Sequence, residues 1–316
     1  IMSCIQRSLL SFLLVGSLFT SCKSPGPDAK AEISADPKVA ALKMPEGFRA
    51  DHLYSPGTHD QGSWVAMTFD DKGRMITSDQ YGELYRLTIP AIGADTSKEK
   101  IKVEPMSLKI PGDTSWRARR IGYAHGLLYA FNSLYVMVND EGDTAHSRPS
   151  GIYRLEDTDK DDQYDRITLL KRLDGDGEHG PHSMVVSPDG KQIYFIAGNF
   201  TAMPKFDKYA PLPGWDMDNL LPLLRDPNGH DNTVNTHGGW IAKMDPDGSN
   251  SVLIANGFRN PFDLAFNEDG EMFTFDSDME WDFGLPWYRP IRICHVTSGG
   301  EFGWRPGSDK WSPANA

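Results

Sequence analysis

The sequence predicts an all-β fold of the β-propeller type, on three observations. An apolar run, a turn rich in Asp, Asn and Gly, and a second apolar run recur together, with turns near residues 73, 132, 190 and 270. Polar and apolar residues alternate in the flanking segments 83–87, 151–155 and 240–244, as in strands with one buried face. No amphipathic helix of normal length stands out after the leader. A strand-turn-strand unit that recurs along the chain in this way is typical of a propeller. A sandwich or barrel would show more even strand spacing and no turn repeated at the same place in each unit.

Turn chemistry indicates where each hairpin reverses. Asp or Asn opens the turn, and Gly accepts the positive φ that the turn requires. The hairpins are expected at residues 65–77, 183–196 and 262–275, with a weaker relative at residues 126–138 that turns at Asn132. An irregular insertion rich in Pro and Asp, roughly residues 200–237, explains the wider last interval.

Composition limits the classes of function. The chain has 316 residues with 39% hydrophobic and 11% aromatic residues, which suits a globular domain with a core. A formal net charge of −12 argues against binding to nucleic acid or to anionic lipid headgroups. Of the three cysteines only Cys294 lies in the body, so no intrachain disulfide framework is expected there. Without a C-x-x-C-H motif, no covalently attached haem is expected within these residues.

The N-terminal residues predict export. Arg7 precedes an apolar run over residues 9–19 that is too short to span a bilayer as a stable helix. The run ends in Phe19-Thr20-Ser21-Cys22, which resembles the lipobox of bacterial lipoproteins, and the resemblance implies lipidation of Cys22. The alternative is an ordinary cleaved signal peptide with an incidental cysteine. The lipid would anchor the protein in the bacterial cell envelope, on the periplasmic or outer-membrane face.

The expected organisation follows from these signals. Residues 1–21 are a lipoprotein signal peptide, residues 22–45 a flexible tether rich in Ser, Pro, Ala, Asp and Lys, and residues 46–316 the propeller. The chain begins with Ile1 before Met2 and stops at Ala316 just after a structured stretch. We therefore expect a piece of a longer reading frame, with C-terminal blades missing.

Two clusters precede inner-strand hairpins, at the expected mouth of the central channel. The first is Gly177-Glu178-His179-Gly180-Pro181-His182, where His179 could accept a proton from a substrate hydroxyl. The second contains Arg259 and Asn260, and a guanidinium suits a carboxylate or carbonyl ligand. A structural histidine and an interblade salt bridge are the alternatives.

Two acidic segments could hold a cation. Asp157, Asp159 and Asp161 resemble the front of a calcium loop, although Asp162 stands where the loop glycine should be and Thr168 where its bidentate Glu should be. The second segment carries four carboxylates that repel one another unless they are solvated, protonated or bridged: Asp276, Asp278, Glu280 and Asp282. Exposed acidic turns are the alternative in both cases.

Together these landmarks resemble the soluble quinoprotein glucose dehydrogenases, also called glucose/sorbosone dehydrogenases. One shared pattern runs from His179 to the Pro-Asp-Gly turn that ends at Gly190, and a second runs from Arg259-Asn260-Pro261 to Phe266. The resemblance implies a six-bladed propeller that binds pyrroloquinoline quinone (PQQ) and calcium at the channel mouth. It assigns His179 as catalytic base and Arg259 and Asn260 as cofactor contacts.

The resemblance also has departures. The family's calcium segment is replaced here by the acidic residues 276–282, and Arg305 stands where the family has a proline. The sequence of residues 276–289 is more similar to that of a divergent branch, the large exported membrane-bound dehydrogenases of Bacteroidetes, Verrucomicrobia and Planctomycetes. Some of these carry a cytochrome c domain after the propeller.

The predicted function is PQQ-dependent oxidation of a sugar, an aldose or a related alcohol, with a cytochrome-type electron acceptor as partner. The lipid anchor would be the only membrane contact. A non-catalytic propeller that binds glycans or a protein at the same mouth remains an alternative, because fold alone does not choose a function. A metal-dependent lactonase or another hydrolase is a weaker alternative, since it would need acidic ligands converging on the channel.

Overall fold

Four hairpin turns join the first two strands of each sheet in the computed structural model. The structure describes residues 36–92, 94, 100–112, 114–115, 120–140, 148–212, 237–277 and 291–304. Three turns end on a glycine in the left-handed region: Gly73, Gly190 and Gly270 have φ of 72°, 71° and 80°. The fourth is a two-residue turn at Phe131 and Asn132, whose φ values of 51° and 53° match the primed turns that favour hairpins. All four predicted hairpins are present.

The strands form four mostly antiparallel sheets, each meandering outward from its first strand. The first sheet comprises β1 (Trp64–Phe69), β2 (Met75–Asp79), β3 (Leu84–Thr88) and β4 (Lys102–Pro105). The second comprises β5 (Ala124–Ala130), β6 (Ser133–Val138), β7 (Gly151–Glu156) and β8 (Arg166–Arg172). The third comprises β9 (Pro181–Val186), β10 (Ile193–Ala197), β12 (Gly239–Met244), β13 (Val252–Phe258) and the short β11 (Lys208–Tyr209). The fourth comprises β14 (Asn260–Phe266), β15 (Met272–Ser277) and β16 (Arg292–Val296).

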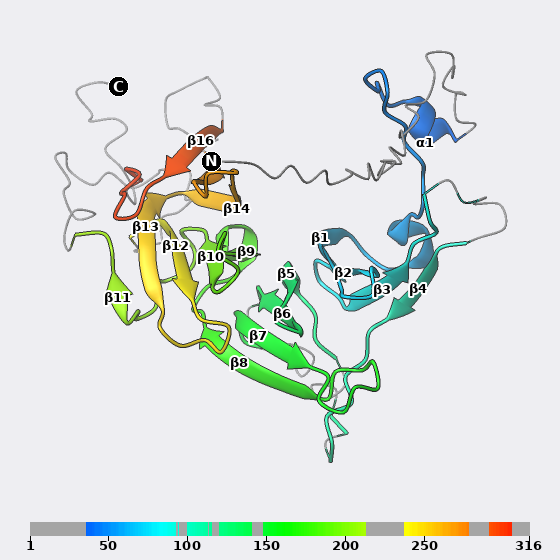
Figure 1. The fold of residues 1–316 in the computed structure, drawn as a ribbon, viewed down its shortest axis with the longest axis horizontal. Helices are drawn as coiled ribbons and strands as arrows, with labels where there is room; N and C mark the ends of the chain where they lie inside the picture. The colour runs from blue at the N-terminus through cyan, green and yellow to red at the C-terminus, as the bar shows by residue number, and fades with distance from the viewer. Residues whose placement is uncertain are drawn as a thin grey trace, which may run out of the picture. The chain divides into compact units, whose positions relative to one another are not determined.

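The sheets are arranged as the blades of a β-propeller. The first strands β1, β5, β9 and β14 contact one another in chain order, so they are the inner strands of consecutive blades. Figure 1 shows the blades following one another from cyan through green and yellow to red. The predicted fold class is confirmed for these four blades. Ring closure by further blades stays a prediction.

The core lies between successive blades rather than on one side of a sheet. Every residue of β6 is buried. Leu134, Val136 and Val138 pack toward the first blade, whereas Tyr135 and Met137 pack toward the third. A third cluster, which includes Ile196, Leu264 and Val296, joins the third and fourth blades. A strand buried on both faces appears in sequence as a continuous apolar run, as residues 134–138 do.

Residues 1–53 and 54–316 form two separate compact units. The second unit begins at Tyr54 and contains the blades. The predicted start of the propeller domain at residue 46 stays a prediction. In the described part of the first unit, Asp36 caps the short helix α1 (Pro37–Ala40) by accepting the Lys38 N–H at 2.8 Å. The second unit adds the 3-10 helices η1 (Pro56–His59) and η2 (Gly177–His179).

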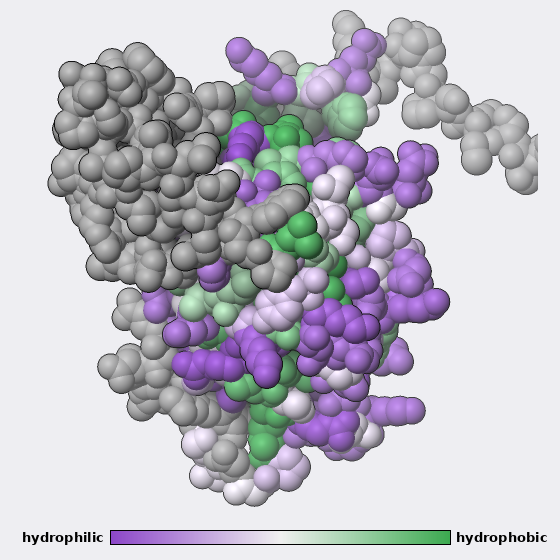
Figure 2. Space-filling view, turned by 90° about the vertical axis from the view of Figure 1, so that its left-hand side faces the viewer, coloured by the Kyte–Doolittle hydropathy of each residue, from purple (hydrophilic) through white to green (hydrophobic). Residues whose placement is uncertain are grey.

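No helix among the described residues is both long and apolar enough to cross a membrane. Cys22 and the rest of the predicted leader lie outside those residues. Figure 2 shows one face, on which hydrophilic residues alternate with smaller hydrophobic patches, as expected for a chain with a net charge of −12.

Candidate active site

The His179 imidazole is held in one orientation at the entrance to the inner strand β9. It lies on η2 and is buried, with its ring 4.3 Å from the ring of Phe200. Its Nδ1 lies 2.6 Å from Asn199 Oδ1. An amide oxygen only accepts hydrogen bonds, so Nδ1 carries the proton in this pair. In the neutral ring Nε2 therefore has the lone pair and can accept a proton.

Asn199 also connects His179 to the arginine predicted as a cofactor contact. The Asn199 backbone N–H donates to the Arg259 carbonyl at 2.8 Å, while its side chain accepts from His179. The loop that follows β10 thus bridges the His179 turn and the start of β14. Sequence reasoning missed Asn199, because no spacing motif connects it to either partner.

A buried carboxylate binds the backbone N–H groups of Arg259 and Asn260. Asp276 on β15 accepts the backbone N–H of Arg259 at 3.1 Å and that of Asn260 at 2.8 Å. Its other oxygen accepts from the Arg292 guanidinium at 2.7 Å. Burial raises the pKa of the Asp276 carboxyl, while Arg292 and the two N–H groups oppose that rise. The Arg259 side chain donates from Nη1 to Ser277 Oγ at 3.0 Å.

The carboxylate of Asp276 is therefore used to shape the turn before β14. Asp276 was also a candidate metal ligand, and a cation bound to it would have to displace Arg292 from the same carboxylate. The other candidates of that segment, Asp278, Glu280 and Asp282, lie outside the described residues.

The Asn260 side chain joins its strand to the His179 turn. Its Oδ1 lies 2.7 Å from Nε2 of His182, and its Nδ2 donates to the Glu178 carbonyl at 3.1 Å. The structure thus brings together the two clusters that the sequence placed at the channel mouth, which lie about 80 residues apart in the chain.

A glycine makes this close approach feasible. A Cβ at Gly198 would lie 2.6 Å from Asn260 Oδ1 and 2.8 Å from the His179 carbonyl carbon. No side chain fits there without displacing one of the two groups. Sequence reasoning gave Gly198 no role, because an isolated glycine at a strand end carries no specific signal.

A second polar group lies beside this site, on the neighbouring blade. The rings of His125 on β5 and His182 on β9 are nearly parallel, with centroids 6.2 Å apart. The Asn139 amide nitrogen lies 3.0 Å from His125 Nδ1 and donates to the Gly177 carbonyl at 2.8 Å. Asn139 therefore fixes the start of the His179 turn from the second blade.

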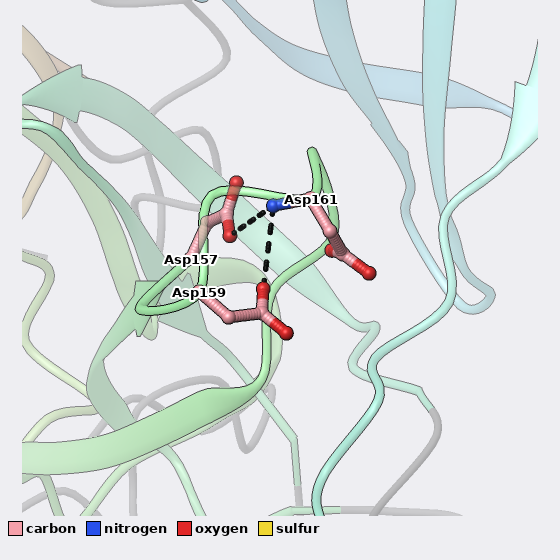
Figure 3. A group of neighbouring side chains, drawn as sticks. All are labelled: Asp157, Asp159 and Asp161. Atoms are coloured by element: carbon pink, nitrogen blue, oxygen red, sulfur yellow. Dashed lines mark hydrogen bonds between the residues drawn. The ribbon is translucent and has the colours of Figure 1, made fainter.

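The predicted calcium loop lies between β7 and β8, away from these residues along the chain. Carboxylate oxygens of Asp157, Asp159 and Asp161 lie within 4.8 Å of one another. Figure 3 shows Asp157 and Asp159 both accepting the Asp161 backbone N–H, at 3.1 and 3.3 Å. The Lys109 ammonium lies 2.6 Å from an Asp161 oxygen, so a cation there would compete with a lysine. Calcium at this loop stays a prediction.

Asp162 occupies the position at which a calcium loop requires glycine. Its φ of 72° is the left-handed conformation that glycine would supply. Its carboxylate turns instead toward the first blade, where Arg74 donates to both oxygens at 2.6 and 2.7 Å. Arg74 holds the pKa of the Asp162 carboxyl well below its usual range.

The known proteins that this chain resembles are solved structures of low sequence identity. No family model matches the chain, and no curated protein matches it. Among solved structures it is similar to the PQQ-bound aldose sugar dehydrogenase of Streptomyces coelicolor, at 16% identity over 77% of this chain, with a TM-score of 0.46. This chain spans 62% of that protein's length.

Two further structures show the same level of likeness. An oxidoreductase of Thermus thermophilus, described as a glucose dehydrogenase, is 16% identical over 79% of this chain and 68% of its own, with a TM-score of 0.46. A protein described as a gluconolactonase is 14% identical over 86% of this chain and 71% of its own, with a TM-score of 0.43. These likenesses are weak, so the fold assignment rests on the four blades themselves.

Proposed function

We propose that this chain is the propeller part of an exported oxidoreductase that oxidises a CH–OH group of a sugar or a related alcohol, with PQQ as the hydride acceptor. The observation that carries the proposal is the oriented, buried imidazole of His179, which Asn199 links to the turn of Arg259. A base of fixed tautomer, joined through Asn199 to the backbone of a buried arginine, suits proton abstraction next to an anionic cofactor.

His179 would accept the substrate hydroxyl proton at Nε2. The resulting imidazolium would lie 3.9 Å from a carboxylate oxygen of Glu178. Asn199 would keep Nδ1–H engaged throughout, so the ring would not need to turn during the transfer.

The residues fit PQQ in their chemistry. PQQ carries carboxylates and quinone carbonyls, and it supplies the acceptor for the substrate's hydride. Arg259 is the cationic donor that would bind one of these groups, and Asp276 holds its backbone in place. The exposed aromatic rings of Phe262 and Phe275, whose centroids lie 6.4 Å apart, offer a planar group a surface.

Calcium fits less well around the residues described. Arg292 already neutralises Asp276, and Lys109 already neutralises Asp161. The proposal therefore assigns no step to a metal. A metal-dependent lactonase, which needs converging acidic ligands, has the same difficulty.

A location in the cell and an electron-accepting partner belong to the proposal. Export and lipidation at Cys22 would place the enzyme in the bacterial cell envelope, which rests on the leader residues alone. Electrons would pass to a cytochrome-type acceptor, because a quinone reduced by two electrons must be reoxidised for each turnover.

The test is a titration of the full chain with PQQ, with and without Ca²⁺, followed by aldose-dependent reduction of a dye. Arg259→Ala should weaken PQQ binding about tenfold or more, as expected for loss of a charge-assisted contact. His179→Ala should keep PQQ binding but lower kcat by about 10²-fold or more. Arg166→Ala and His59→Ala, which change exposed residues of the same types, should change neither quantity. Absence of PQQ binding at every calcium concentration would refute the dehydrogenase proposal.

A further inference from the structure

The Asn260 amide makes a hydrogen bond at each end, and one partner is a second histidine. Oδ1 lies 2.7 Å from His182 Nε2, and Nδ2 donates to the Glu178 carbonyl at 3.1 Å. Because Oδ1 can only accept, Nε2 of His182 carries the proton. A rotated amide would set its oxygen against the Glu178 carbonyl oxygen and its NH₂ against the His182 N–H. The two partners therefore permit one orientation.

The surroundings of His182 hold its ring in place. Its side chain is buried, with 1% of the residue exposed. The His125 ring lies 6.2 Å away in a nearly parallel arrangement, and the Phe262 ring lies 4.6 Å away. Among the described residues, Nδ1 has no hydrogen-bond partner, so the polar contact that orients the ring is the one with Asn260.

The bond with Asn260 lies at the junction of the two halves of the site. Glu178 immediately precedes His179, and Arg259 immediately precedes Asn260. Any rotation of the Asn260 amide would shift the His179 turn relative to the start of β14. Gly198 limits the available space, since a Cβ there would already meet both Asn260 Oδ1 and the His179 backbone.

We propose that His182 is a positioning residue, which donates Nε2–H to Asn260 Oδ1 and thereby fixes the His179 turn against the strand that carries Arg259. This inference rests on the proposed function for the roles of His179 and Arg259. His182 itself would touch neither substrate nor cofactor. A site that must be held to within about 0.5 Å needs such supporting hydrogen bonds.

The test compares three variants of the full chain. His182→Phe keeps a ring of similar size between His125 and Phe262 but removes the donor. His182→Gln restores an N–H donor. Ser183→Ala is the matched control, because Ser183 Oγ donates to Asp263 at 2.7 Å and so supplies another side-chain bond between β9 and β14 without involving Asn260.

The first readout does not depend on the proposed reaction. Nitrogen-15 NMR of labelled histidine should show His182 as the Nε2–H tautomer at neutral pH. His182→Phe should move the His179 ring signals and the Asn260 side-chain signals, while Ser183→Ala should leave them in place. An Nδ1–H tautomer, or unchanged signals in His182→Phe, would overturn the inference.

The second readout is PQQ affinity and turnover. His182→Phe should lower both PQQ affinity and kcat by about tenfold, the cost of one buried hydrogen bond. His182→Gln should recover to within about threefold of the wild type, and Ser183→Ala should match it. A phenylalanine variant as active as the wild type, or a glutamine variant no better than the phenylalanine one, would overturn the positioning role. If the wild type binds no PQQ, the proposed function fails, and the NMR result alone decides the role of His182.

Discussion

Individual residues in this propeller adopt strained or buried states for identifiable reasons. Asp162 takes a left-handed backbone conformation that costs a residue with a Cβ about 1 kcal/mol. Its carboxylate accepts both Arg74 bonds and also lies 2.7 Å from the Lys72 ammonium. Whereas Asp162 is a charged group in ion pairs, His182 is a buried polar ring that stays neutral.

Asp162 yields a stability prediction that separates strain from charge. Asp162→Ala should lower the free energy of unfolding by about 1 kcal/mol, because it loses the ion pairs with Arg74 and Lys72, while the strained φ is the same as in the wild type. Asp162→Gly loses the same ion pairs but relieves the strain, so it should be more stable than the alanine variant by about 1 kcal/mol. Urea denaturation of both variants measures the difference. An alanine variant at least as stable as the glycine variant would contradict the strained conformation.

His182 yields a pH prediction. Burial lowers the pKa of His182 from 6.5 to about 4, and the facing His125 adds to the effect. The unfolded chain therefore binds a proton at higher pH than the folded chain does. Its contribution to stability is complete above about pH 6.5 and is lost as the pH falls toward about 4. Between about pH 7 and about pH 5 the loss should be about 2 kcal/mol.

The measurement is urea denaturation at both pH values. His182→Gln should show a weaker pH dependence than the wild type by that amount. His59→Gln, at an exposed histidine, should keep the wild-type slope. Equal slopes for the wild type and His182→Gln would show that His182 titrates normally in the folded protein.

At the scale of elements, the site depends on the segments that enter and leave the inner strands. The His179 turn precedes β9, the Arg259 turn precedes β14, and the loop after β10 lies between them. Backbone hydrogen bonds join the three, including Gly198 N–H to Gly180 O at 3.0 Å. The relative position of these three segments depends on Gly198, which lies against the His179 backbone and the Asn260 side chain.

Substitution of that glycine should loosen the junction. Gly198→Ala places a methyl group against the His179 backbone and Asn260, which should destabilise the fold by about 1–3 kcal/mol through overpacking. Gly57→Ala is the control, since a Cβ there meets nothing within 4 Å. Thermal unfolding followed by circular dichroism compares the two. Equal melting temperatures would show that the blades absorb the methyl group without strain.

At the scale of the whole molecule, the first and fourth blades carry apolar side chains on the faces turned away from the blades between them. Ile293 on β16 is 81% exposed, and Phe275 pairs with it across the sheet. Met67 on β1 is 66% exposed, whereas its neighbour Ala66 packs into the core toward the second blade. In the middle blades the equivalent faces are buried.

Such faces should make the chain self-associate despite its charge. Ile293→Ser should weaken association by about tenfold, if the side chain becomes buried in the contact. Ile92→Ser, at an exposed residue in a turn rather than on a sheet face, should leave association unchanged. Light scattering over a concentration series measures both. Equal effects of the two substitutions would show that association does not use the sheet face.

The sequence by itself determined the four hairpins of this protein and the flanking strands near residues 83–87, 151–155 and 240–244. Turn residues such as Gly73 and Asn132 act locally, through allowed φ angles. The alternation of polar and apolar residues in β7 and β12 predicted one buried face, and that expectation was wrong: both faces of these strands are buried, because each strand packs against two neighbouring blades. His179, Arg259 and Asn260 could be selected as candidate site residues because each stands just before an inner strand or at its first residue. Only the tertiary structure decided which groups meet there. Contacts between separate loops and strands bring four further residues to the site: Asn199, Gly198, His182 and Arg292. A hydrogen bond between residues about 80 positions apart, such as that between His182 and Asn260, produces no periodic pattern in the sequence, so sequence reasoning does not detect it.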